Sequence, residues 1–121
     1  MTTGPEELRI RTKKFAIRVV RLYNSLPYRG AAQVLGKQLL RCGTSVAANY
    51  RAACRGRSRA EWISKIGIVV EEADEVVFWL EMLVDCEVIP ESKLADLLKE
   101  AHELSALFTA SQSTARRKQS G

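Results

Sequence analysis

Apolar residues recur every three or four positions along most of the chain, which is the spacing of one face of an α-helix. The first such segment covers about residues 5–26, where Pro5 suits a first helical position and Pro27 ends the pattern. The second segment covers about residues 30–55 and ends at Gly56. The spacing therefore predicts two long helices joined by a short turn.

Two further segments show the same spacing. Ser58, followed three residues later by a glutamate, has the signature of a helix N-terminus and predicts a third helix over about residues 58–86. After a proline-containing turn, a fourth helix is expected over about 90–112, followed by a flexible basic tail over 113–121. Four long helices with short connections predict one all-α domain, residues 1–121, folded as an antiparallel up-down-up-down four-helix bundle.

The third helix carries more apolar residues than one core face needs. Of the 23 residues 62–84, 15 are apolar, whereas a core-facing bundle helix uses about three in seven. The excess predicts a second partner, most simply another copy of the chain. A monomer with an unusually apolar central helix is the alternative. The candidate interface residues are Trp62, Phe78 and Trp79.

Polar residues also share faces of the second and third helices. Small residues around Gly43 would let a neighbouring helix approach closely, and Ser45 and Asn49 lie one helical turn apart on the same segment. We predict that Ser45 and Asn49 pair with Glu72 or Glu75 across the bundle. The full predicted network is Ser45, Asn49, Lys65, Glu72 and Glu75. Its expected role is to fix helix register, and catalysis is the alternative.

Charge is divided unevenly along this chain of net charge +5. Between Leu8 and Ala60 there are thirteen Lys or Arg and no acids, whereas between Glu61 and Leu104 there are three Lys and twelve acids. Two interpretations stay open: the basic half faces phosphates, or basic and acidic helices pair within or between subunits. The candidate nucleic-acid-binding residues are Arg11, Lys14, Arg18, Arg21, Arg51 and Arg55.

No set of residues predicts catalysis, a cofactor or a metal site. The single histidine, His102, stands among charged residues and offers too few ligands for a metal. The glycines form no phosphate-binding loop, and no sequence-reading nucleic-acid motif is present. We therefore expect a protein that is not an enzyme. Three cysteines without a paired motif, no signal peptide and no membrane-length apolar run predict a cytoplasmic protein without a membrane partner.

Four stretches of the chain carry a family resemblance. They are residues 38–52 (QLLRCGTSVAANYRA), 58–65 (SRAEWISK), 71–75 (EEADE) and 78–83 (FWLEML). In this order and spacing, they resemble bacterial four-helix bundle proteins related to those encoded in intervening sequences of 23S ribosomal RNA genes. The resemblance covers about residues 15–108. It implies a four-helix bundle that is commonly assembled as a ring-like homopentamer.

A related branch of this family suggests a function. The accessory variability proteins of diversity-generating retroelements form a basic pentameric barrel that binds reverse transcriptase and nucleic acid. The partners implied by this resemblance are other copies of the chain, RNA, DNA or a reverse transcriptase. We expect an oligomeric scaffold that binds nucleic acid or a nucleoprotein through the first and second helices. A structural or protein-interaction oligomer with no nucleic-acid role is the alternative.

Overall fold

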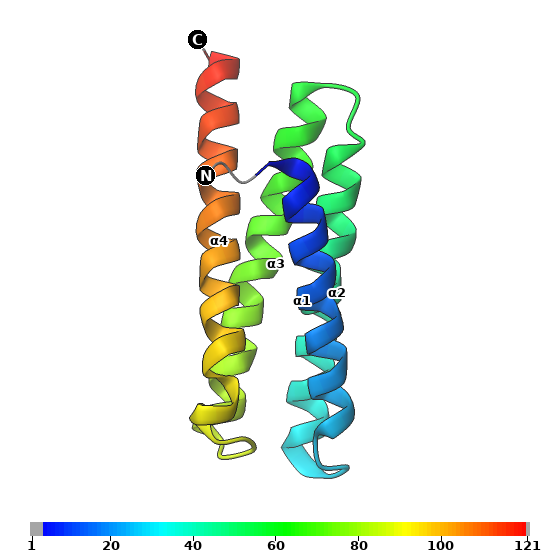
Figure 1. Ribbon diagram of the computed structural model, residues 1–121, viewed down its shortest axis with the longest axis vertical. Coiled ribbons are helices and arrows are strands. Elements are labelled where there is room, and N and C mark those ends of the chain that lie inside the picture. The colour runs from blue at the N-terminus through cyan, green and yellow to red at the C-terminus, as the bar shows by residue number, and fades with distance from the viewer. Residues whose placement is uncertain (1–3, 121) are drawn as a thin grey trace.

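Four helices that alternate in direction make up the computed structural model, which describes residues 4–120 (Figure 1). Helix α1 spans Pro5–Ser25, α2 Gly30–Cys54, α3 Arg59–Asp85 and α4 Glu91–Ser120. No strand occurs within these described residues, so this part of the chain is an all-α four-helix bundle. None of its helices has both the length and the apolar character that crossing a membrane requires.

The helix bounds lie within one residue of those expected, except at the C-terminal end. Helix α4 continues to Ser120, whereas the sequence predicted an end near residue 112 and a flexible tail over 113–121. That expectation is wrong as far as Ser120, because the segment lacks Gly and Pro and is rich in residues that favour helix. Gly121, the end of the expected tail, lies outside the described residues.

One apolar core runs through the bundle, and all four helices contribute to it. Tyr50, near the C-terminal end of α2, is buried in it, with ring centroids 5.2 Å from Phe108 and 6.0 Å from Trp62. Burying one large apolar side chain contributes about 1.5–3 kcal/mol. The most deeply buried large side chains are Phe15 and Val19 from α1, Leu39 and Tyr50 from α2, Ile66 and Leu80 from α3, and Leu104 and Phe108 from α4.

Helix α3 packs against both α2 and α4, and this position accounts for most of its apolar residues (Figure 1). Of the 15 apolar residues over 62–84, only Ile68 and Phe78 are exposed, at 37% and 50%. The interface candidates Trp62 and Trp79 are partly buried against the chain's own core. The apolar excess that predicted a partner chain is therefore largely used within the bundle.

Glycines allow α1 and α2 to approach closely, as the small residues around Gly43 predicted. A Cβ added at Gly43 would lie 2.8 Å from Val19 Cγ1, and one added at Gly36 would lie 2.6 Å from Leu26 Cδ1. Both distances are shorter than any real carbon–carbon contact of this kind. The pair of helices therefore reaches its observed separation only because these two positions lack side chains.

We expect Gly43→Ala to lower the free energy of unfolding, because its methyl group would press on the branched side chain of Val19. Overpacking a core typically costs about 1–3 kcal/mol, more than the roughly 1 kcal/mol that Ala gains over Gly inside a helix. Gly67→Ala is a matched control, because its Cβ would meet only the flexible Gln112 amide, at 3.0 Å. The control should be neutral or stabilising in urea denaturation followed by circular dichroism. Equal effects of the two substitutions would contradict the packing argument.

Candidate nucleic-acid interface

The surface formed by α1, α2 and the turn that follows carries many cations without acidic partners. Of the thirteen Lys or Arg between Leu8 and Ala60, two form ion pairs among the described residues, Arg11 and Arg41. The other eleven are exposed and belong to no ion pair in that part of the chain. They are Arg9, Lys13, Lys14, Arg18, Arg21, Arg29, Lys37, Arg51, Arg55, Arg57 and Arg59.

Arg11 binds α4 and closes the bundle between the first and last helices. Its Nη2 lies 2.6 Å from Glu100 Oε1, its Nε donates to Glu100 Oε2 at 3.2 Å, and Glu103 Oε2 lies 3.9 Å from Nη2. The hydrogen bond to Glu100 is the main cause that raises the pKa of the Arg11 guanidinium. Of the predicted nucleic-acid-binding residues, Arg11 is thus the one that forms an ion pair with a carboxylate among the described residues.

A groove of about 550 Å³ lies between α1 and α2. Four exposed cations line it: Arg9 and Lys13 on α1, Arg51 on α2, and Arg55, which directly follows α2. Its remaining lining residues are Glu6, Ile10, Thr44, Ala47 and Ala48. We call this feature the α1–α2 groove. It combines a cationic lining with an apolar strip formed by Ile10, Ala47 and Ala48, and Glu6 is the one acid among its described lining residues.

The structure groups the predicted cations differently from the sequence. Arg51 and Arg55 share the α1–α2 groove with Arg9 and Lys13, two residues that the sequence reasoning missed. Lys14, Arg18 and Arg21 are exposed on α1 but do not line the groove. An antiparallel hairpin brings together positions that are equally far from its turn. That rule, applied to the predicted helices, would have placed the N-terminal part of α1 beside the C-terminal part of α2.

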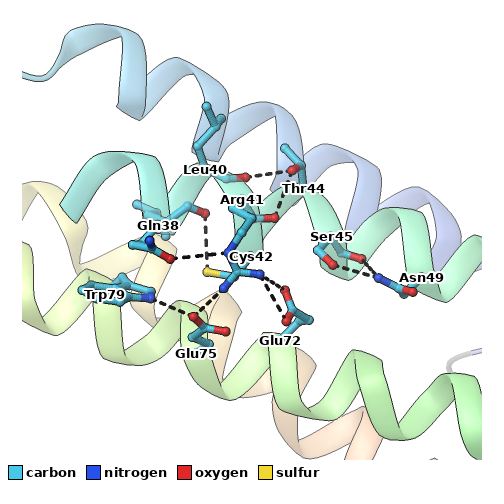
Figure 2. A network of polar contacts seen from close by, with 11 residues as sticks. Gln38, Leu40, Arg41, Cys42, Thr44, Ser45, Asn49, Glu72, Glu75 and Trp79 are labelled. Carbon is cyan, nitrogen blue, oxygen red and sulfur yellow. Dashed lines mark hydrogen bonds and ion pairs between the residues drawn. The ribbon is translucent and has the colours of Figure 1, made fainter. Parts of the chain in front are cut away.

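Arg41 organises a polar network between α2 and α3 (Figure 2). Its Nη1 lies 3.1 Å from Glu72 Oε2, and its Nη2 lies 2.5 Å from Glu75 Oε1. Trp79 Nε1 also donates to Glu75 Oε1, at 3.2 Å, and Arg41 Nε donates to Gln38 Oε1 at 3.4 Å. The hydrogen bond from Arg41, followed by that from Trp79, lowers the pKa of the Glu75 carboxyl. The network ties the second helix to the third near the surface.

Ser45 and Asn49 bond to each other instead of to the carboxylates. Asn49 Nδ2 donates to Ser45 Oγ at 2.8 Å and to the Ser45 carbonyl at 3.0 Å (Figure 2). The predicted pairing with Glu72 or Glu75 is therefore wrong, because the longer, five-donor guanidinium of Arg41 reaches both carboxylates. The sequence offered a signal for this partner, since Arg41 lies four residues before Ser45.

Lys65 is the other predicted network residue that stays outside the network. It is exposed, and among residues 4–120 it forms no ion pair with either carboxylate. Its helical spacing placed it correctly on the face that includes Glu72 and Glu75, but sharing a face does not produce contact. Arg41 satisfies both acids from the neighbouring helix.

The described residues offer little for catalysis. Burial raises the pKa of the Cys42 thiol to about 12, which keeps it protonated and a poor nucleophile. His102 is exposed on α4. Within residues 4–120, no three His, Cys, Asp or Glu side chains gather as a site for a metal ion. The feature with the clearest chemical character is therefore the cationic surface.

We expect Arg41→Gln to raise the pKa of Glu75 toward the ordinary glutamate value of about 4.3. A lowered carboxyl pKa stabilises the fold at pH values above the ordinary value, and this contribution is lost as pH falls through the lowered pKa. In the Arg41→Gln variant, Glu75 should therefore contribute less to the loss of stability that occurs as the pH falls. An NMR titration of the Glu75 carboxyl carbon measures the shift.

Lys65→Gln is the matched control for this titration, because it removes a cation from the same face without touching Glu75. It should leave the Glu75 midpoint where the parent has it. An unchanged midpoint in Arg41→Gln would show that the guanidinium does not set the carboxyl pKa.

Comparison with known proteins agrees with the family that the four sequence stretches indicated. The family described as 23S rRNA-intervening sequence protein matches residues 7–110. A crystal structure of a protein with unknown function from the S23 ribosomal protein family of Bacteroides thetaiotaomicron VPI-5482 is 33% identical, with a TM-score of 0.84. The alignment covers 90% of this chain and 97% of that one. A comparison with curated proteins finds no match. The chain therefore belongs to the 23S rRNA-intervening sequence protein family.

Proposed function

We propose that the protein is a non-enzymatic, self-assembling scaffold of the cytoplasm whose α1–α2 surface binds RNA or DNA. The observation that carries the proposal is the excess of unpaired cations. Eleven of the thirteen Lys or Arg between Leu8 and Ala60 have no acidic partner among the described residues. If the basic helices served only to neutralise the acidic ones inside a single chain, most of these cations would be paired.

Phosphate is the ligand that best suits such a surface. Arg and Lys bind phosphate oxygens through charge-assisted hydrogen bonds, and the binding releases counterions from the nucleic acid. Contacts of this kind fix position and carry little sequence information. The similar Bacteroides protein is described as having unknown function. Support for the proposal therefore comes from the surface charge of this chain.

The nucleic-acid proposal is tested by fluorescence anisotropy with mixed-sequence RNA and DNA at several salt concentrations. We expect the logarithm of the affinity to fall linearly with the logarithm of salt, with a slope of about −0.7 per neutralised phosphate on single strands. A groove variant should bind more weakly and with a shallower slope, by about 0.7 for each phosphate that its cations no longer neutralise. In that variant, four residues are replaced by Gln: Arg9, Lys13, Arg51 and Arg55.

A matched variant removes the same number of charges from α4. In it, four exposed residues are replaced by Gln: Lys93, Lys99, Arg116 and Arg117. Arg11 is kept in both variants because it holds α1 to α4. We expect the α4 variant to bind nearly as the parent does. Absence of binding by the parent at low salt, or equal losses in the two variants, would refute the assignment of the α1–α2 surface.

The second candidate function is a structural or protein-interaction oligomer with no nucleic-acid role. Exposed apolar side chains on the outer faces of the bundle favour self-assembly, and the family resemblance points to a ring of five copies. Phe78 is half exposed and packs edge-on against Trp79, with ring centroids 4.8 Å apart. The other large apolar residues exposed on the described helices are Ile10, Ile17, Val20, Val34 and Ile68.

We expect Phe78→Glu to shift sedimentation velocity profiles toward the monomer, because a charge placed in an apolar interface loses its hydration. Phe78→Leu should keep the parent's assembly. Tyr28→Glu is a second control, since Tyr28 is 93% exposed in the turn between α1 and α2, away from α3. If Phe78→Glu sediments as the parent does, Phe78 is not part of an interface between copies.

A further inference from the structure

The α1–α2 groove differs from the rest of the cationic surface because its charged side chains accompany an apolar strip. Ile10 is 50% exposed there, and Ala47 and Ala48 line the same groove. An apolar strip beside the cations would add nothing to the binding of a free phosphate ion, which is charged on every side. The composition of the groove instead fits a ligand with regularly placed anionic groups joined by less polar parts.

We propose that the α1–α2 groove holds one or two nucleotides of a single-stranded nucleic acid, with the phosphates on its cations and the sugars and bases on its apolar strip. The inference rests on the proposed function and names the form of nucleic acid that this site takes. The groove volume of about 550 Å³ falls within the range of roughly 300–1,000 Å³ that is usual for sites of small organic ligands. It therefore suits nucleotide-sized units.

A duplex fits the same groove poorly. In a double helix the base faces are stacked inside, so only base edges, sugars and phosphates reach a protein. Neighbouring helices in a bundle have axes about 8–10 Å apart, and a seam between two such helices does not admit a double helix. Its phosphates could touch the outer cations, but nothing would cover Ile10. A single strand can turn its sugars and base faces toward the strip while its phosphates meet the cations.

The cations are placed to follow a strand. Arg9 and Lys13 are four residues apart on α1, and Arg51 in the last turn of α2 is four residues before Arg55, the residue that caps the helix. Each pair is thus separated by about 6 Å along its helix axis. Two such pairs on opposite sides can hold a phosphate backbone that runs along the groove. Glu6 repels phosphate at the end of the groove nearest the start of α1, so the bound stretch is short.

The lining also indicates how selective the site is. Among the described residues no aromatic side chain lines the groove, so this part of the chain gives it none of the stacking platforms that strengthen many single-strand sites. Thr44 is the one hydroxyl among the described lining residues. Binding should therefore tolerate changes of base sequence and gain affinity from several copies of the site acting on one strand.

The test fills the groove without removing a cation. Ala48 is exposed on α2 and lines the groove, so Ala48→Trp occupies the apolar strip while it leaves the core untouched. We expect the affinity for a mixed-sequence single strand to fall about tenfold, and that for a duplex of the same sequence to change less than about twofold. Ala48→Glu places an anion at the same position and should weaken single-strand binding at least as much.

Ala106→Trp is the matched control, because Ala106 is exposed on α4 and lies outside the groove. It should bind single strands and duplexes as the parent does. Circular dichroism and sedimentation confirm that each variant is folded and assembled like the parent. Unchanged single-strand binding by the folded Ala48→Trp variant, or equal losses for single strand and duplex, would overturn the groove assignment.

Two competitors distinguish the strand from other anions. Adenosine monophosphate should displace a labelled single strand only at far higher concentration than an unlabelled strand does. Polyglutamate of equal charge should also compete weakly. Equal competition by either one would overturn the single-strand assignment in favour of a free nucleotide or an acidic peptide. Failure of the parent to bind any nucleic acid at low salt would instead refute the proposed function itself.

Discussion

The close approach of α1 to α2 at Gly43 is the constraint on which the remaining features depend. Because no side chain separates the helices there, Val19 packs directly on the α2 backbone and the hairpin becomes a firm two-helix layer. The same approach brings the N-terminal part of α1 beside the C-terminal part of α2. The cations of two sequence segments about forty residues apart then line one groove. A wider hairpin would leave two separate basic helices.

The basic and acidic residues that are separated along the sequence are connected in the fold by ion pairs between two pairs of helices. Among the described residues, each of the basic helices α1 and α2 forms its ion pairs through one arginine: Arg11 joins α1 to α4, and Arg41 joins α2 to α3. Both arginines face glutamates of the neighbouring helix. The other cations of the same helices are exposed and meet no carboxylate among the described residues. Exposed ion pairs contribute little to stability, typically below about 1 kcal/mol, so these contacts matter mainly for how the helices are aligned.

Much of the fold could be predicted from the sequence, because helical periodicity, prolines and caps are local signals. They placed the ends of the first three helices within one residue. The end of α4 was missed, because a polar segment without Gly or Pro gives no local stop signal. The excess of apolar residues over 62–84 predicted a surface for a partner chain. Much of it instead packs within the bundle, because α3 lies between two neighbouring helices. Periodicity reveals how much of a helix is apolar but not how many helices surround it.

The candidate site was less predictable, because its residues are brought together by pairing between helices. Arg51 and Arg55 were recognised by their charge, whereas Arg9 and Lys13 become relevant only once the register of the α1–α2 hairpin is known. The Arg41 network was similarly hidden. Sequence spacing placed Glu72 and Glu75 on one face, yet their partner depends on which α2 side chain is long enough to reach them.

That network also bears on the groove, because it marks the side of α2 that faces α3. With Arg41 held by Glu72 and Glu75 (Figure 2), Ser45 and Asn49 follow along the side facing α3. Successive residues of a helix are about 100° apart, so this orientation turns Ala48 and Arg51 toward solvent and α1. A rotation of one residue would move Arg51 out of the groove. The buried face of α2, with Leu39, Val46 and Tyr50 at most 1% exposed, sets this orientation, and the ion pairs of Arg41 agree with it.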